Sequence, residues 1–349
     1  MLHTIVAASL MMPVLYEPPQ EEAMTRIAFG SCAKEDKPQP IWDVIAADDP
    51  DLFLFIGDNM YADIPAVPQS AADIAKAYEQ LAAIPEWQRF SENFPVLATW
   101  DDHDYGKNDA GEEWFLKEDA QRLFLDFFDV PSDSPRRARQ GVYHSEVFGP
   151  VGQRVQVILL DTRYHRSPIH ETPDWRDAGM NGPYGPGAGG EGTILGEAQW
   201  EWLEAQLREP AQVRIVASSI QVVASEHEWE GWYTMPDERQ RLFDLIGETD
   251  AGGVIMISGD RHLIELSCDR DRGTAYPMWD FTSSGMNQGP RSLDEPNGHR
   301  VGPVARDTNY GVISIDWDSP DPVITLEGRD QDGAVILSQL IFLSTLQEK

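Results

Sequence analysis

The chain has few cysteines and few basic residues for its length. Cys32 and Cys268 are the two cysteines among 349 residues, too few for a disulfide framework. Lys and Arg total 27 against 59 Asp and Glu, so the formal net charge is −32. Such a chain lacks the basic face that wrapping DNA or RNA requires, and an anionic membrane surface repels it. The shortages exclude a disulfide-stapled protein and nucleic-acid wrapping, and they argue against binding to an anionic membrane surface.

The sequence also lacks a run that could span a membrane. The apolar stretch at residues 5–15 is interrupted by Pro13 and is shorter than the roughly 20 apolar residues that a membrane helix needs. This stretch is typical of the apolar core of a signal peptide, so we expect residues 1–24 to be a signal or a disordered N-terminus. That predicts a periplasmic or extracellular protein. A cytoplasmic protein is the alternative, because no Lys or Arg, and hence no twin-arginine pair, precedes the run.

Apolar residues are plentiful. Hydrophobic residues make up 41% of the chain and aromatic residues 10%, including 11 Trp, which is enough for a large buried core despite the charge. We expect residues 25–349 to form a single catalytic domain. The stretch at residues 165–196 is rich in Gly and Pro, which predicts a long surface loop or lid within that domain.

Short apolar runs alternate with stretches of helical periodicity, which predicts an α/β fold with a mainly parallel sheet. The C-terminal part alternates apolar and polar residues, as antiparallel strands do. The predicted strands are residues 25–29, 51–56, 95–100, 155–160, 213–217, 254–257, 311–316, 323–326 and 334–342. The predicted helices are residues 41–47, 71–84, 113–128 and 196–207.

Chemically reactive side chains follow four of the predicted strands, where sites form in parallel sheets. Taken singly, each has an ordinary structural explanation: a buried thiol, a turn with a helix cap, a solvated acidic loop. Their shared position at strand ends and their types favour a two-metal centre instead. The four groups are Cys32, Asp58, Asp102 with His103, and Asp260 with His262.

Asp58 is the natural bridging carboxylate between two cations. Tyr61 follows three residues later and offers a phenolate oxygen, which requires a strongly Lewis-acidic ion such as Fe³⁺. Cys32 and His262 would complete that first site. A second site would combine Asp58 with Asp102 and Asp260, whose oxygen donors favour Ca²⁺, Mg²⁺ or Mn²⁺.

Other residues nearby are candidates for handling the substrate. His103 could protonate a leaving oxygen, with Asp104 orienting its ring. Arg163 and Arg261 could bind phosphate oxygens. For Arg163 a structural salt bridge is an equal alternative. Two cations about 3.5–4 Å apart clamp a phosphate and activate water, so the ligand set predicts hydrolysis of small phosphate esters.

The ordered set of motifs resembles the alkaline phosphatase D (PhoD-like) family of the calcineurin-like metallophosphatase superfamily. The resemblance spans roughly residues 25–315 and rests on Phe29-Gly30-Ser31-Cys32, Gly57-Asp58-Asn59-Met60-Tyr61, Leu160-Asp161-Thr162-Arg163, Trp100-Asp101-Asp102-His103-Asp104, Leu195-Gly196-Glu197-Ala198-Gln199-Trp200 and Gly259-Asp260-Arg261-His262.

This resemblance implies a four-layer α/β/β/α sandwich, with two mixed sheets flanked by helices. It also implies a centre of Fe³⁺ and one or two Ca²⁺ that hydrolyses phosphomonoesters or phosphodiesters. The implied metal ligands are Cys32, Asp58, Tyr61, Asp102, Asp260 and His262, and His103 is the implied general acid. Asp102 is preferred to Asp101 because it directly precedes His103.

Two alternatives stay open. The same centre could act on phospholipids or organophosphate triesters. A non-catalytic, calcium-binding extracellular protein is the other alternative, although a calcium scaffold has no use for Cys32 and Tyr61 beside Asp58. The sequence does not predict the oligomeric state.

Overall fold

Two six-stranded sheets form the centre of the fold in the computed structural model, which describes residues 21–270, 276–288 and 295–347. Residues 1–20 of the segment predicted to be a signal or a disordered N-terminus, residues 1–24, lie outside the described residues. The first sheet has the order β12 (Val335–Phe342), β11 (Val323–Asp330), β10 (Asn309–Asp316), β1 (Arg26–Gly30), β2 (Leu52–Ile56), β3 (Val96–Thr99). The second has the order β4 (His144–Phe148), β5 (Val155–Leu159), β6 (Val213–Ala217), β7 (Val254–Ser258), β9 (Met278–Ser283), β8 (Ile264–Asp269).

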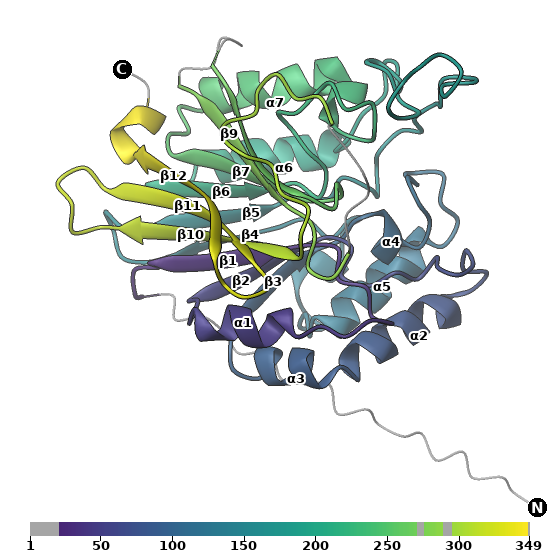
Figure 1. The fold of residues 1–349 in the computed structure, drawn as a ribbon, viewed down its shortest axis with the longest axis horizontal. Coiled ribbons are helices and arrows are strands. Elements are labelled where there is room, and N and C mark those ends of the chain that lie inside the picture. Colours follow the sequence, from purple (N-terminus) through teal and green to yellow (C-terminus); the bar gives the residue numbers. More distant parts are fainter. Residues whose placement is uncertain (1–20, 271–275, 289–294, 348–349) are drawn as a thin grey trace, which may run out of the picture.

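Helices cover the outer faces of both sheets, so the fold has four layers (Figure 1). This confirms the predicted α/β/β/α sandwich. On the side of the first sheet lie α1 (Ile41–Ala47), α2 (Ala71–Ala82), α3 (Pro85–Ser91), α4 (Asp102–Tyr105) and α5 (Lys117–Phe127). On the side of the second sheet lie α6 (Glu197–Leu207) and α7 (Pro236–Glu248). Short 3₁₀ turns span Pro135–Arg137, Trp232–Thr234 and Leu343–Leu346.

The Leu-Phe-Leu-Phe-Ile sequence of β2 shows how the layers are held together. Successive side chains of a strand point to opposite faces. Leu52 and Leu54 therefore pack into the core shared with the second sheet, and Phe53 and Phe55 pack among the helices, where both contact Trp42 of α1. All five residues of β2 are buried, as expected of a strand covered on both faces.

Strand direction decides where the polar residues gather. β1, β2 and β3 run parallel to one another, and so do β5, β6, β7 and β9. The carboxyl ends of each set therefore lie along one edge of its sheet, and the residues that follow those ends are brought together. β10, β11 and β12 pair antiparallel, as the C-terminal alternation predicts.

Several element boundaries differ from the sequence prediction. The helix predicted at residues 71–84 ends at Ala82, and a second helix begins at Pro85, because the proline ring cannot continue a helix from the preceding residues. The helix predicted at residues 113–128 begins only at Lys117. Residues 165–196, all of which the structure describes, form neither helix nor strand. No helix in the described part of the chain combines the length and hydrophobicity needed to cross a bilayer.

Candidate metal centre

The candidate ligands at the strand ends adopt a backbone conformation that is unusual for residues with side chains. Cys32 (φ 63°), Asp58 (φ 49°), Asp260 (φ 68°) and His262 (φ 52°) all lie in the left-handed region. Non-glycine residues pay a steric cost there, and such strain persists at functional sites that hold a required geometry. The sharp turns keep these side chains at the edge where the parallel strands end.

Glycines let the two sheet edges approach each other. A Cβ on Gly259, after β7, would lie 2.5 Å from Ser31 Oγ after β1. Gly57, with φ +111°, would place a Cβ 2.7 Å from Asp101 Cβ and 3.1 Å from Ser219 Cβ. Ser219 follows β6 of the second sheet, so both glycines stand where backbone of one sheet meets the other. The Gly-Asp pairs in the sequence thus mark the junction of the two sheets.

One group of ligand atoms forms around Asp58. The ligand atoms of Cys32, Asp58 and His262 lie within 4.8 Å of one another. Cys32 Sγ is 3.3 Å from Asp58 Oδ2. The Tyr61 hydroxyl lies 3.1 Å from the same oxygen and 3.3 Å from His262 Nε2. The four predicted ligands of the first site therefore converge, and they offer sulfur, nitrogen and oxygen donors.

A second group shares Asp58. Ligand atoms of Asp58, Asp102 and His103 also lie within 4.8 Å of one another. Asp102 Oδ2 accepts a 2.8 Å hydrogen bond from the Asp109 amide. Because Asp58 belongs to both groups, its position is that of a carboxylate shared by two neighbouring cations.

The buried carboxylates fit a cation better than they fit a metal-free core. Asp58 and Asp102 are almost fully buried, and within the described residues the Oδ1 atom of each has no hydrogen-bond partner. Burial, reinforced by the charges of Asp102 and Asp104, raises the pKa of Asp58 well above its ordinary value, although His103 opposes the rise. A buried carboxylate with one oxygen left without a partner is costly unless its charge is neutralised or paired, and a coordinated cation would do this.

The Cys32 thiol and the Tyr61 phenol give the same indication. Burial, together with the nearby charge of Asp58, raises the pKa of the Cys32 thiol and of the Tyr61 phenol well above their ordinary values. Neither group would ionise there without a strong positive charge beside it. A bound metal supplies such a charge and deprotonates a coordinating thiol outright.

The carboxylate that holds His103 is Asp63, which corrects the assignment of that role to Asp104. His103 Nδ1 lies 2.6 Å from Asp63 Oδ1, and the imidazole packs against the Tyr61 ring with 4.1 Å between centroids and a tilt of 32° between the planes. Asp104 instead accepts hydrogen bonds from the backbone amides of Asn59 and Asp101, both at 2.9 Å. Successive residues of the short α4 helix point in different directions, so His103 and Asp104 cannot face each other.

His103 is set up to carry a proton. Burial opposes a charged imidazole, but the charges of Asp102 and Asp58 and the contact with Asp63 outweigh it and raise the pKa of His103. Asp63 stands two residues after Tyr61, and that proximity in the sequence was the available signal for its role.

Arg163 lies within a network of buried ion pairs. Its side chain is fully buried, and Nε donates a 2.6 Å hydrogen bond to Asp101 Oδ1. Its Nη1 lies 2.9 Å from Glu230 Oε1. Ser219 Oγ also donates to Asp101 Oδ1, at 2.6 Å. This geometry matches the structural salt bridge, the alternative that the sequence left open, and not direct contact with phosphate. It also leaves Asp102, and not Asp101, in the ligand groups.

Arg261 and Asp260 lie at the edge of the centre. Arg261 Nη2 is 2.6 Å from Glu295 Oε1, and Nη1 is 3.4 Å from Asp260 Oδ2, so two carboxylates already neutralise the guanidinium. Asp260 is not part of any of the ligand groups found among the described residues, although its charge acts on Asp58 and Asp102. The structure thus places Asp260 beside the centre without bringing it to ligand spacing.

A further group of carboxylates was not predicted. Ligand atoms of Asp102, Asp109 and Glu230 lie within 4.8 Å of one another. Tyr184 donates a 2.8 Å hydrogen bond to Asp109 Oδ2, so the segment of residues 165–196 reaches this group. Asp109 and Glu230 come from loops far apart in the sequence and lie in no recognisable motif, so no local signal could have found them.

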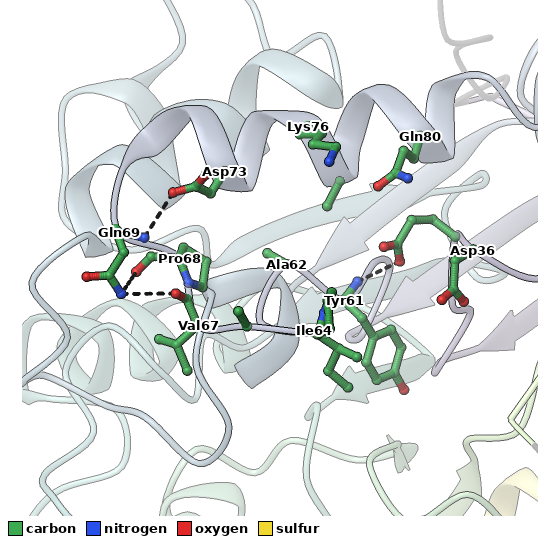
Figure 2. A pocket seen from close by; sticks show the side chains of 14 residues that line it. Asp36, Tyr61, Ala62, Ile64, Val67, Pro68, Gln69, Asp73, Lys76 and Gln80 are labelled. Carbon is green, nitrogen blue, oxygen red and sulfur yellow. Dashed lines mark hydrogen bonds between the residues drawn. The ribbon is translucent and has the colours of Figure 1, made fainter.

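A pocket of about 400 Å³ lies behind the loop that carries Tyr61, between that loop and α2 (Figure 2). Glu35 Oε2 accepts a 2.8 Å hydrogen bond from the Tyr61 amide on this side. The Tyr61 ring points away from α2, and its hydroxyl contacts Asp58 and His262. The pocket is therefore on the side of the loop opposite the ligand groups, where Glu35 fixes the backbone of Tyr61.

Comparisons with known proteins identify a family and similar folds. A model of the PhoD-like phosphatase family matches residues 27–309. The solved structure of PhoD is similar, with a TM-score of 0.70 and 17% identity over 96% of this chain and 74% of that one. A purple acid phosphatase isolated from yellow lupin (Lupinus luteus) seeds has a TM-score of 0.63 and 16% identity over 93% of this chain and 55% of its own. At these identities the structural likeness establishes the fold alone. A search of curated protein sequences finds no significant match.

Because Asp58 belongs to two ligand groups, we predict that its substitution lowers the metal content of both. Asp58→Asn removes the only charge common to both ligand groups, so we expect the purified variant to lose at least half of each metal. Elemental analysis against protein concentration measures this. Asp104→Asn is the matched control, because it alters a buried neighbouring carboxyl that belongs to neither group; it should keep both metals. A normal metal content in Asp58→Asn would remove Asp58 from the centre.

Proposed function

Because the chain belongs to the PhoD-like phosphatase family, we propose that it hydrolyses phosphomonoesters or phosphodiesters at a centre of Fe³⁺ and one or two Ca²⁺. The observation that carries the proposal is the position of Asp58, shared by the group with Cys32 and His262 and the group with Asp102 and His103. Cations bound there would supply Lewis acidity, polarising the ester and making water acidic enough to act as nucleophile.

The donor types support the choice of metals. Cys32 and Tyr61 are both buried groups of raised pKa, and they accompany His262 and Asp58 on one side of the centre. Fe³⁺ is acidic enough to bind a phenolate and a thiolate near neutral pH. Asp102 and the other members of the remaining groups offer mainly oxygen, which favours Ca²⁺, with Mg²⁺ or Mn²⁺ as substitutes.

A second Ca²⁺ has its own candidate ligands. Asp102, Asp109 and Glu230 supply oxygen donors only, at a spacing that a large cation can span. Glu230 also pairs with Arg163 and Arg166, so its charge is partly neutralised without a metal. This group supports the upper figure of two calcium ions in the proposed centre.

The chain's own residues account for the movement of the proton. His103 adjoins Asp58 and Asp102, and Asp63 holds its Nδ1 side, so Nε2 is the nitrogen available to a leaving oxygen. Although burial opposes it, the charges of Asp102 and Asp58 and the contact with Asp63 raise the pKa of His103, which favours the protonated form that a general acid needs. Asp102 stays ionised beside it: although burial opposes ionisation, His103, Arg163 and the Asp109 amide lower the pKa of Asp102 to about 2.

The reaction itself is tested by hydrolysis of matched aryl phosphate mono-, di- and triesters that share one leaving group. We expect turnover of the monoester, the diester or both, loss of activity after chelation of the metals, and recovery on adding Fe³⁺ with Ca²⁺. Turnover of the triester alone would favour the organophosphate alternative. If the metal-loaded protein hydrolysed no ester, the enzymatic proposal would be defeated and a calcium-binding scaffold favoured.

The Fe³⁺ assignment predicts colour. Purified protein should absorb visible light through tyrosinate-to-iron charge transfer, and Tyr61→Phe should bleach or shift that band. Tyr78→Phe is the matched control: Tyr78 is a buried tyrosine of α2 whose hydroxyl has no hydrogen-bond partner among the described residues. Its removal should leave the spectrum unchanged. A colourless, iron-free and fully active wild-type protein would contradict the assignment.

The general-acid role of His103 predicts a dependence on the leaving group. His103→Ala should slow an alkyl ester, whose leaving group is poor, by about 10²–10⁴-fold, and an activated aryl ester much less. Asp63→Asn should cause a smaller loss with the same selectivity, because it only orients the ring. His144→Ala is the control, since His144 forms a similar pair with Glu146 on the edge strand β4, away from the centre. Equal losses for both esters in His103→Ala would exclude the role.

A further inference from the structure

Two tryptophans from separate loops meet beside the metal centre. Trp175 lies in the segment of residues 165–196, and Trp229 lies in the loop between β6 and α7. Their ring centroids are 5.9 Å apart and the planes are nearly perpendicular, at 75°. Five other tryptophans are among the largest fully buried side chains of the fold, whereas Trp175 and Trp229 are both partly exposed. The pair therefore presents aromatic surface to solvent instead of filling the core.

An arginine packs against each of these rings. Arg261 Cζ lies 5.1 Å from the centroid of the Trp229 ring, and Arg176 Cζ lies 4.1 Å from that of Trp175. The four side chains thus form a series, which we term the Arg–Trp ladder: Arg261, Trp229, Trp175, Arg176. The Arg261 side chain is nearly buried next to Asp260, and Arg176 is exposed. The ladder therefore runs from the metal centre outward to the surface.

The backbone around the ladder ties it to the centre. Glu230, directly after Trp229, shares a ligand group with Asp102 and Asp109. The Tyr184 hydroxyl, from the same segment as Trp175, donates to Asp109, and the Tyr184 backbone amide donates to the Glu228 carbonyl at 2.9 Å. The aromatic pair is therefore held at the rim of the centre by two independent loops.

We propose that the Arg–Trp ladder binds the alcohol part of the substrate and selects phosphate esters that carry a planar aromatic ring. The proposal rests on the proposed function, because it needs the phosphate to be held at the metal centre. An ester bound there must direct its organic group outward, and the partly exposed rings of Trp175 and Trp229 lie beside the centre to receive it. Aromatic rings prefer to meet such faces by offset stacking or edge-to-face contact.

The carboxylates around the ladder disfavour substrates whose organic group carries further negative charge. Asp174 and Asp177 flank Trp175 in the sequence, and Glu228 adjoins Trp229 and accepts a hydrogen bond from the Asn181 amide through Oε2. Each arginine of the ladder covers one ring. A group with additional phosphates would be repelled by these carboxylates, within a chain whose net charge is −32. The favoured substrate is a monophosphate ester of an uncharged aromatic alcohol.

Binding of two phosphonates separates recognition of the ring from leaving-group chemistry. Phenylphosphonate and methylphosphonate have the same charge type and contain a P–C bond that is not hydrolysed, so each can be used as a competitive inhibitor of the metal-loaded enzyme. We expect wild type to bind phenylphosphonate at least tenfold more tightly. Trp175→Ala and Trp229→Ala should each reduce that preference about fivefold to tenfold, while methylphosphonate binding changes less than twofold.

Two further variants act as controls. Trp175→Phe keeps a ring and should retain most of the preference. Trp317→Ala removes a partly buried tryptophan at the opposite edge of the first sheet, where its Nε1 donates to the Met24 carbonyl before β1. This variant should behave as wild type. Thermal unfolding of every variant verifies that the comparison is made between folded proteins.

Each remaining outcome has a definite meaning. Equal weakening of both phosphonates in the alanine variants would overturn the proposal and show that the ladder only fastens the segment of residues 165–196. A wild type that hydrolyses esters but binds both phosphonates alike would overturn it while leaving the proposed function intact. A protein that binds neither phosphonate and hydrolyses no ester would defeat the proposed function and this proposal together.

Discussion

The burial of several carboxylates at the junction of two sheets is the constraint on which the rest of the structure depends. Asp58, Asp101, Asp102 and Asp104 are almost completely shielded from solvent within a short stretch of the sheet edge. Buried charges of one sign repel one another and lose their hydration, so each must be protonated, hydrogen-bonded or paired with a cation. The surrounding loops supply these three solutions to different members of the cluster.

Asp104 and Asp101 are satisfied by the protein. Backbone amides hold both oxygens of Asp104, and burial raises its pKa to about 8. Arg163 and Ser219 hold Asp101, and Arg163 extends the network to Glu230. These contacts build a rigid support under the site, and they hold Arg163 away from direct contact with substrate.

The protein satisfies Asp58 and Asp102 less completely than it satisfies Asp101 and Asp104. Each keeps one buried oxygen without a partner among the described residues, and each faces ligand atoms of other side chains. Asp58 and Asp102 can therefore serve a cation, because a cation site needs carboxylate lone pairs that protein hydrogen bonds have not already used. Cys32 and Asp58 adopt the strained left-handed backbone conformation. That conformation directs their side chains from the strand ends toward the other candidate ligands.

Sequence patterns predicted much of this arrangement because they act locally. Alternation of apolar runs with helical periodicity predicted the two-sheet α/β fold once the resemblance to the metallophosphatases was taken into account. Parallel strands end at one edge, so the residues after β1, β2 and β3 had to be neighbours; those after β7 join them because the edge of the second sheet meets that of the first. Short elements were less accessible: α4 is a single turn, too short for helical periodicity to show in the sequence.

By itself the sequence determined the donor types, their position at strand ends, and the acidity that makes a local positive centre necessary for binding an anionic ester. Only the tertiary structure decided that Asp102, and not the adjacent Asp101, faces the centre. It also decided that Asp63 and not Asp104 holds His103, and that Arg163 forms ion pairs with Asp101 and Glu230. It also decided that Asp109 and Glu230 join the cluster and that Trp175 meets Trp229. The reason is that periodicity specifies which face a residue occupies, whereas contacts between distant loops depend on how those loops close over the sheets.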